Sequence, residues 1–332
     1  MLFMILTLIV AAAAAMPGPA GDGELPAWNR QPSLDSLAAG IQRIGDIPEA
    51  PDLLLLSAWL GWPGMISSVS FIPGGSQGDI APSPQVQAWG AAPPRQGMDS
   101  ILVIAPWPTV LPVGLTVSAQ PGETLHFGLA PDTSWSRAFL STPAPGAGPI
   151  LPDSSGLFAL VPSETGVYWI EAVKDGDSGP VVVILLPLFV GVTVLDALRG
   201  CPGVYRQEAA TLGQVRGEMD SLRNASGLQG LGEDPGLDSL ARVRATEVAL
   251  SGRVDHSGLL SRELPGNGLA RAENVARGEG LDEAWRMVLA SPAHLATCLS
   301  PRYSTLGMGA SVEVDRNGWQ VVLVQIFEGA GP

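Results

Sequence analysis

Three side chains near the C-terminus have the types and spacing that proton transfer or metal binding requires. His256 lies in the segment VDHSG, Glu273 in AENVARG and His294 in SPAH. They include two of the three histidines in the chain. Imidazole and carboxylate groups bind borderline metals and move protons near neutral pH. Any chemistry that this protein performs is therefore expected here.

The residues around His294 predict how its side chain is positioned. Ser291 is a good helix N-cap and Pro292 suits the first helical position, which puts His294 in the first turn. The positive end of a helix disfavours imidazolium. We therefore expect a neutral imidazole, the form that binds a metal or accepts a proton. The alternative is a histidine that helps to cap its own helix.

His256 and Glu273 each have a plainer interpretation. His256 follows a helix in a polar turn, where it either points into a cleft or is simply solvated, and its own residues favour solvation. Glu273 either faces the same site as the two histidines or forms a surface salt bridge with Arg271 or Arg277. Two histidines and one glutamate match the ligands of some open zinc sites, whose fourth position is left to water. No HExxH spacing supports such a site.

The elements that must position these residues are helices and strands in alternation. Asp234 or the next residues cap a helix with Pro235 near its first turn. Another helix is expected at 281–290, with Asp282 and Glu283 at its positive end, and paired strands are expected at 303–314 and 318–327 around DRNG. The predicted apolar stripe of the first helix consists of Leu237, Leu240, Val243 and Val248, and its Arg242 and Arg244 are expected on a solvated face. Trp285 of the second helix is expected in the core.

The order of these signals resembles the CAP superfamily of cysteine-rich secretory, antigen 5 and pathogenesis-related proteins, in its bacterial SCP-like form. The resemblance covers about residues 210–328. The matching stretches, in order, are LRNASGLQGL, PGLDSLARVRATEVALSGRVDHSG, RAENVARG, EAWRMVLASPAHLATCLSPRYSTLGMG and WQVVLVQIF. It implies an α/β/α sandwich whose cavity is lined by His256, Glu273 and His294.

One departure from the family pattern affects the expected metal site. The fuller eukaryotic pattern has a second glutamate where this chain has Val288. Glu263, Glu279 or Glu283 could replace it, and nothing in the sequence selects among them. Affinity for Zn²⁺ or another divalent metal is therefore expected to be low, because only Glu273 accompanies the histidines.

The whole chain is expected to be an α+β protein. Residues 1–15 are an apolar run typical of a signal peptide, and 16–32 form a flexible tether rich in Pro and Gly. Residues 33–195 are expected to form two short helices and an antiparallel β-sandwich, 196–215 a linker and leading helix, and 216–328 the CAP domain. The apolar run 180–192 contains Pro187 and favours buried strands over a membrane helix. We expect no stable membrane span after cleavage.

Composition limits the partners and the redox state. The formal charge is −14 and the chain has a single lysine, so a basic surface that follows phosphates is not expected and nucleic acid is excluded as a partner. Cys201 and Cys298 are the two cysteines. In an exported chain they permit one disulfide. The alternative is two separate buried thiols.

These observations favour an exported protein, extracellular or periplasmic, that binds a small ligand, lipid or cell-surface component without catalysis. A second hypothesis is a metal-dependent hydrolase of peptide or cell-envelope polymers, in which His256 and His294 hold the metal and Glu273 is a ligand or base. A third is an adhesion or carbohydrate-binding protein that acts through the β-sandwich. Its candidate stacking residues are Trp89, Trp107, Trp135 and Trp169, for which burial in strand cores is the alternative.

Overall fold

The computed structural model divides the chain into two units, Met1–Leu111 and Pro112–Pro332. The expected signal peptide and His256 lie outside the described residues, and the domain limits expected from the sequence stay predictions. The structure describes residues 29–44, 48–60, 62, 68–72, 88–92, 100–105, 112–114, 116–129, 135–176, 179–206, 209, 211–251, 269–315 and 318–330.

The first unit has the two short helices that the sequence predicts. They are α1 (Pro32–Ile44) and α2 (Ala50–Trp59), and Pro51 is in the first turn of α2. Helix α1 packs on a four-stranded sheet through an apolar face at helical spacing. Strand β1 (Asn29–Arg30), which lies within the stretch expected to be a tether, pairs with β3 (Ala88–Ala92). The other strands of this sheet are β2 (Ser68–Ile72) and β4 (Ser100–Ala105).

The second unit begins with strands that form two sheets, and we call residues 112–190 the β region. One sheet has the order β10-β7-β5 and the other β6-β12-β11-β8-β9. The short strands before and after the turn at Pro121–Glu123 enter different sheets, because β6 pairs with β12 and β7 pairs with β10. The strands are β5 (Pro112–Val113), β6 (Ser118–Ala119), β7 (Leu125–Leu129), β8 (Arg137–Thr142), β9 (Gly146–Ile150), β10 (Leu157–Leu160), β11 (Gly166–Gly176) and β12 (Gly179–Val190).

The apolar run around Pro187 is a strand, as predicted. It forms most of β12, which pairs antiparallel with β11 along its whole length, and Pro187 lies opposite Trp169. Residues 184–190 are buried. Within the described residues, no helix is long and apolar enough to cross a membrane.

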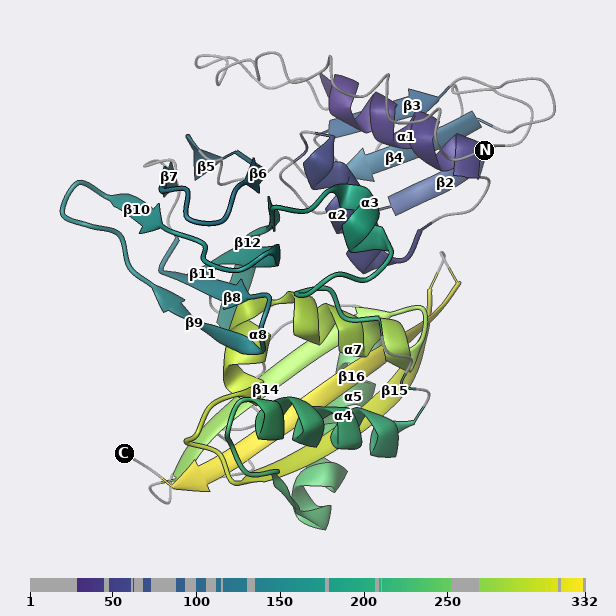
Figure 1. Ribbon diagram of the computed structural model, residues 1–332. Helices are drawn as coiled ribbons and strands as arrows, with labels where there is room; N and C mark the ends of the chain where they lie inside the picture. Colours follow the sequence, from purple (N-terminus) through teal and green to yellow (C-terminus); the bar gives the residue numbers. More distant parts are fainter. Residues whose placement is uncertain are drawn as a thin grey trace. The chain divides into compact units, whose positions relative to one another are not determined.

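The C-terminal region, residues 211–330, is built on a sheet of order β13-β15-β16-β14 with helices on both faces (Figure 1). Helix α5 packs on one face, against Val275, Val322, Val324 and Ile326. Helices α4, α7 and α8 share a second core with Ala276, Leu323 and Phe327 on the other face. The bounds are α4 (Leu212–Ala225), β13 (Gly232–Glu233), α5 (Pro235–Ser251), β14 (Leu269–Gly278), α7 (Leu281–Ala290), α8 (Pro292–Cys298), β15 (Thr305–Asp315) and β16 (Gly318–Ala330).

Most of the local predictions for this region are confirmed. Asp234 Oδ1 accepts hydrogen bonds from the backbone N of Gly236 and Leu237, so it caps α5. Helix α7 has the predicted bounds, and β15 pairs with β16 as an antiparallel hairpin. Trp285 is fully buried, as expected. In the stretch 196–215, expected to be a linker and leading helix, the described residues include the end of α3 (Val194–Leu198) and the start of α4.

The face that α5 buries matches the predicted one in part, because Leu237 and Val248 are buried and Leu240 packs against the same core. Val243 is half exposed, whereas Arg244 is 3% exposed and is therefore not on a solvated face. The buried stripe follows Leu237, Ala241, Ala245 and Val248, which keep the i, i+4, i+8, i+11 spacing of one helical face. The prediction was wrong for Val243 because it passed over the small residues Ala241 and Ala245 in favour of a larger aliphatic one.

Candidate functional site

Helix α8 presents His294 as the sequence predicts. Ser291 is the N-cap, Pro292 is in the first turn, and Ser291 Oγ accepts a hydrogen bond of 3.2 Å from the backbone N of His294. The His294 residue is half-buried. The capping role therefore belongs to the serine hydroxyl.

A carboxyl from the β region also reaches this helix end. Glu171 on β11 accepts a hydrogen bond from Ser291 Oγ and another from the backbone N of Ala293, both at 2.8 Å and both on Oε2. The Glu171 residue is fully buried. Two elements more than a hundred residues apart in the chain thus meet through one carboxyl group.

Burial controls the ionisation of Glu171. Loss of solvation raises the pKa of this carboxyl to about 7, while the hydrogen bonds from Ala293 and Ser291 lower it by less. The second oxygen, Oε1, is buried and accepts no hydrogen bond from the described residues. A buried ion with one oxygen unpartnered is costly, so the neutral acid is favoured up to near-neutral pH.

Behind α8, the sheet carries a buried polar cluster. Asn274 on β14 donates from Nδ2 to the backbone O of His294 at 3.2 Å and to Gln325 Oε1 at 3.1 Å. Its amide also lies 3.5 Å from Cys298 Sγ. Gln325 Nε2 is 3.9 Å from Met308 Sδ. These contacts fix α8 against β14 and β16.

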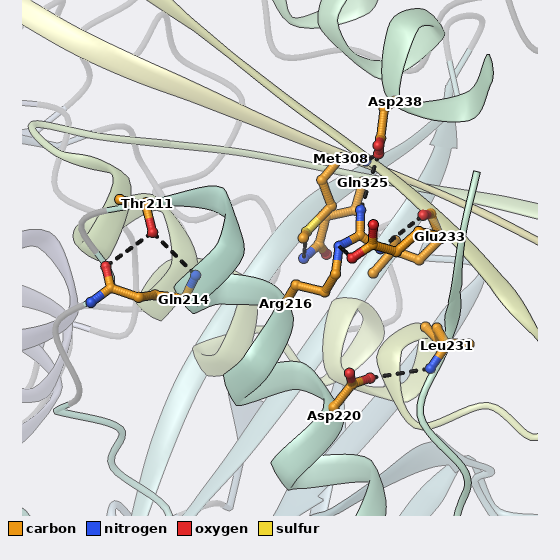
Figure 2. Close-up of polar contacts among 10 residues, drawn as sticks. Thr211, Gln214, Arg216, Asp220, Leu231, Glu233, Asp238, Met308 and Gln325 are labelled. Atoms are coloured by element: carbon orange, nitrogen blue, oxygen red, sulfur yellow. Dashed lines mark hydrogen bonds and ion pairs between the residues drawn. The ribbon is translucent and has the colours of Figure 1, made fainter. Parts of the chain in front are cut away.

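The backbone beside this cluster is held by an arginine on α4. Arg216 donates to Asp238 Oδ1 at 3.1 Å, and its Nε lies 3.3 Å from Glu233 Oε1. Figure 2 shows this arginine between the two carboxylates. It also donates to the backbone O of Leu306 at 3.1 Å. Asp238 Oδ1 accepts a further bond of 2.7 Å from the backbone N of Met308. Arg216 therefore joins α4, α5 and β15.

Glu273 lies in a different environment from His294. Its Oε1 accepts a hydrogen bond of 2.9 Å from Arg244 Nε on α5, and the two side chains are 3% and 4% exposed. Arg244 also lies 3.5 Å from Glu247, whose side chain is half exposed. The sequence suggested a surface salt bridge to Arg271 or Arg277, whereas the observed salt bridge of Glu273 is buried and joins it to Arg244.

The sheet separates Glu273 from helix α8. Successive residues of a strand point to opposite faces. Asn274 contacts α8, whereas Glu273 contacts α5 and lies opposite Ile326, which packs under α5. Among the described contacts, Glu273 therefore belongs to the α5 face of the sheet and Asn274 to the α8 face.

The expected metal site stays a prediction, because its first ligand, His256, lies outside the described residues. A site with two histidines and one glutamate needs all three groups around one point, but Glu273 and α8 are on opposite faces. Among the described residues, no three His, Cys, Asp or Glu side chains form a group that could hold a metal ion. Of the possible substitutes for the missing glutamate, Glu283 accepts a hydrogen bond from the backbone N of Glu279 at the start of α7, and Glu263 lies outside the described residues.

The predicted disulfide is not formed, because Cys201 and Cys298 are both free. Cys298 is buried in the core between α8 and the sheet, next to Asn274 and Gln325. Burial raises the pKa of its thiol to about 12. Cys201 is half-buried, and burial also raises its pKa. The alternative of two separate thiols is the one observed.

Two tryptophans considered for sugar stacking pack inside the β region. Trp169 is 2% exposed and donates from Nε1 to the backbone O of Gly203 at 2.9 Å. Trp135 is half-buried and packs on Phe158 with ring centroids 5.6 Å apart. For Trp169 the strand-core interpretation is confirmed. Trp107 lies outside the described residues.

Sequence reasoning missed Glu171 and Arg244. The signal for Glu171 was available, since VYWIEAV contains one charged residue within a strand of large apolar residues. A charge at such a position is buried only if it is paired or neutralised. The signal for Arg244 was its i, i+3 position relative to the buried Ala241.

Comparisons with known proteins find similarity in structure only. Solved structures similar to the chain include a cysteine-rich secretory protein of Staphylococcus aureus, with 13% identity and a TM-score of 0.29 over 63% of this chain and 80% of that one. This chain is similar to bacterial secreted proteins with a CAP domain. No family model and no curated protein matches it.

Two further structures extend this similarity. An extracellular protein of Bacillus anthracis that contains an SCP domain matches with 12% identity and a TM-score of 0.26, over 66% of each chain. An outer surface protein of Borrelia burgdorferi matches with 16% identity and a TM-score of 0.31, over 36% of this chain and 92% of that one. These three structures are of secreted, extracellular or surface proteins of bacteria.

Proposed function

We propose that this chain is an exported protein whose CAP domain binds a small ligand, lipid or surface component without catalysing a reaction. In this proposal residues 1–15 are the export signal, the β region is a β-sandwich, and 216–328 form the CAP-type α/β/α sandwich. The CAP assignment is supported by the sequence stretches from LRNASGLQGL to WQVVLVQIF, which follow the order of the family along about a third of the chain.

One observation carries the non-catalytic part of the proposal. Glu273, the carboxylate that a metal-dependent hydrolase would need as ligand or base, is paired with Arg244 at 2.9 Å on the α5 face. A carboxylate held by a buried guanidinium is already neutralised. It is also on the opposite face of the sheet from α8 and His294. This arrangement supports binding over metal-assisted hydrolysis.

Calorimetry with Zn²⁺ tests the absence of a metal mechanism. The full chain after signal removal is titrated beside a His256→Ala/His294→Ala double variant and a Glu273→Gln variant. We expect no stoichiometric Zn²⁺ binding by any of them. Stoichiometric binding that the double variant loses would overturn the proposal and favour the hydrolase.

Co-sedimentation tests the binding role directly. The probes are phosphatidylglycerol/phosphatidylethanolamine vesicles and purified peptidoglycan. We expect retention on one of them that is unchanged in His294→Ala, with bovine serum albumin as the negative control. Retention on neither probe, together with Zn²⁺ binding, would refute the proposed function.

A further inference from the structure

The first turn of α8 is capped partly by its own sequence and partly by the β region. Pro292 is at the start of the helix and has no N–H to satisfy. The backbone N of His294 donates to Ser291 Oγ at 3.2 Å, a local cap. The backbone N of Ala293 donates instead to Glu171 Oε2 at 2.8 Å. Both donors of this turn therefore have side-chain acceptors, and one acceptor comes from β11.

The β region also forms much of the surface on which α8 packs. The helix contacts β8, β9 and β11, and its contact with β14 of its own sheet is smaller. Ala147 of β9 packs against the core that contains Leu295 and Cys298 of α8. A helix of seven residues is too short to be stable in isolation. The position of α8 therefore depends on the β region.

The β region is joined to the later part of the chain at other points as well. Trp169 Nε1 donates to the backbone O of Gly203 at 2.9 Å. Ser226 Oγ donates to the backbone O of Pro145 at 3.1 Å. These bonds do not involve α8. A change at Glu171 is therefore expected to leave the two regions joined and to act on α8.

We propose that Glu171 is a positioning residue, through which the β region fixes the N-terminus of α8 and, with it, His294. The β region is then a scaffold for the C-terminal region and not an independent adhesion module. This role goes beyond the proposed function, because it does not depend on which ligand the protein binds.

The contact needs an acceptor at position 171. Methionine is similar in length to glutamate but has only a weak acceptor, so Glu171→Met would leave Ala293 N–H and the Ser291 hydroxyl without this partner. A buried donor that loses its acceptor corresponds to an opening constant about 10- to 100-fold larger. Glutamine keeps one side-chain oxygen, which can accept both hydrogen bonds. Glu171→Gln is therefore the conservative variant.

Hydrogen exchange measured by mass spectrometry on the full chain tests the hold on α8. Peptides that cover residues 291–298 are compared between variants at one pH. We expect Glu171→Met to lower their protection about 10- to 100-fold, and Glu171→Gln to restore most of it. Glu164→Met is the matched control, because Glu164 is an exposed acceptor of the β region that binds the backbone N of Ala144. It should behave as the wild type.

The imidazole NMR signal of His294 tests positioning separately from stability. The chain has three histidines, so His294→Ala identifies this signal in the full chain labelled at histidine. His126, exposed on β7, is an internal reference. We expect the His294 signal to shift in Glu171→Met and to return towards its wild-type position in Glu171→Gln, while the His126 signal stays in place.

Three outcomes would overturn the proposal: wild-type protection of 291–298 in Glu171→Met, a His294 signal that does not move in that variant, or a Glu171→Gln variant that behaves like Glu171→Met. If Glu171→Met does not fold, exchange of the Ala293 amide in the wild type decides the matter. Protection of this amide supports the contact, and exchange at the unprotected rate overturns it. These measurements use neither Zn²⁺ nor vesicles nor peptidoglycan, so their failure is distinguishable from failure of the proposed function.

Discussion

Replacing Glu273 by glutamine distinguishes a structural carboxylate from a functional one. Glu273 and Arg244 are both almost fully buried and lie 2.9 Å apart. At an effective dielectric constant of about 20, two unit charges at this distance attract by about 6 kcal/mol. Desolvation of the two ions offsets much of this attraction. Glutamine leaves Arg244 as a buried charge without that neutralising partner, which costs about 3 kcal/mol of unfolding free energy.

The assay is urea unfolding of the full chain, followed by circular dichroism, for Glu273→Gln, Arg244→Met and the double variant. We expect each single change to destabilise by about 3 kcal/mol and the double variant to lose less than the sum, because the second change removes the other half of the same buried pair. Glu247→Gln is the matched control. Glu247 is half exposed and 3.5 Å from Arg244, so its loss should cost less than about 1 kcal/mol.

A Glu273→Gln variant as stable as the wild type would refute this reasoning. Glu273 would then be free for a ligand or a metal, and the non-catalytic proposal would lose the observation that carries it. Additive effects in the double variant would show that the two groups are not coupled.

Three further results are expected. The pKa of Glu171 is raised from 4.5 to about 7. The free energy of unfolding, measured with urea at a series of pH values, should therefore fall by about 3 kcal/mol as pH rises from below 4.5 to above 7. This fall should be absent in Glu171→Gln. A Cβ at Gly309 would overlap the backbone of α5, whereas one at Gly148 would meet nothing within 4 Å. In thermal unfolding, Gly309→Ala should therefore lower stability by about 1–3 kcal/mol. Gly148→Ala should not lower it. Both thiols are free and Cys298 has a pKa of about 12. Iodoacetamide should therefore label Cys298 only after denaturation. A disulfide between the two cysteines, found by mass spectrometry in protein purified without reductant, would contradict the free thiols.

Local signals predicted the elements of the C-terminal region well. Ser291, Pro292 and Asp234 act within a few residues of themselves, so capping could be deduced from their neighbours alone. Likewise, Pro187 and the β-branched residues around it were enough to favour a strand for β12. These predictions needed no knowledge of the tertiary fold.

The arrangement of the candidate site could not be predicted in the same way. Which face of the sheet Glu273 takes depends on the pairing of β14 with β16, and a shift of one residue would exchange Glu273 with Asn274. The partner of Glu171 is more than a hundred residues away, and no local pattern indicates it. His256 lies outside the described residues, so its part in a cavity stays a prediction.

The hydroxyl of Ser291 restricts which amino acids position 291 can accept. Aspartate and asparagine are normally as good as serine at a helix N-cap. Here the side chain must also donate a hydrogen bond to Glu171. Aspartate would place a second carboxylate against a buried one, and asparagine would have to supply both its oxygen and its amide in the space of one hydroxyl. Natural variation at this position should therefore be confined to serine and threonine for as long as residue 171 is glutamate.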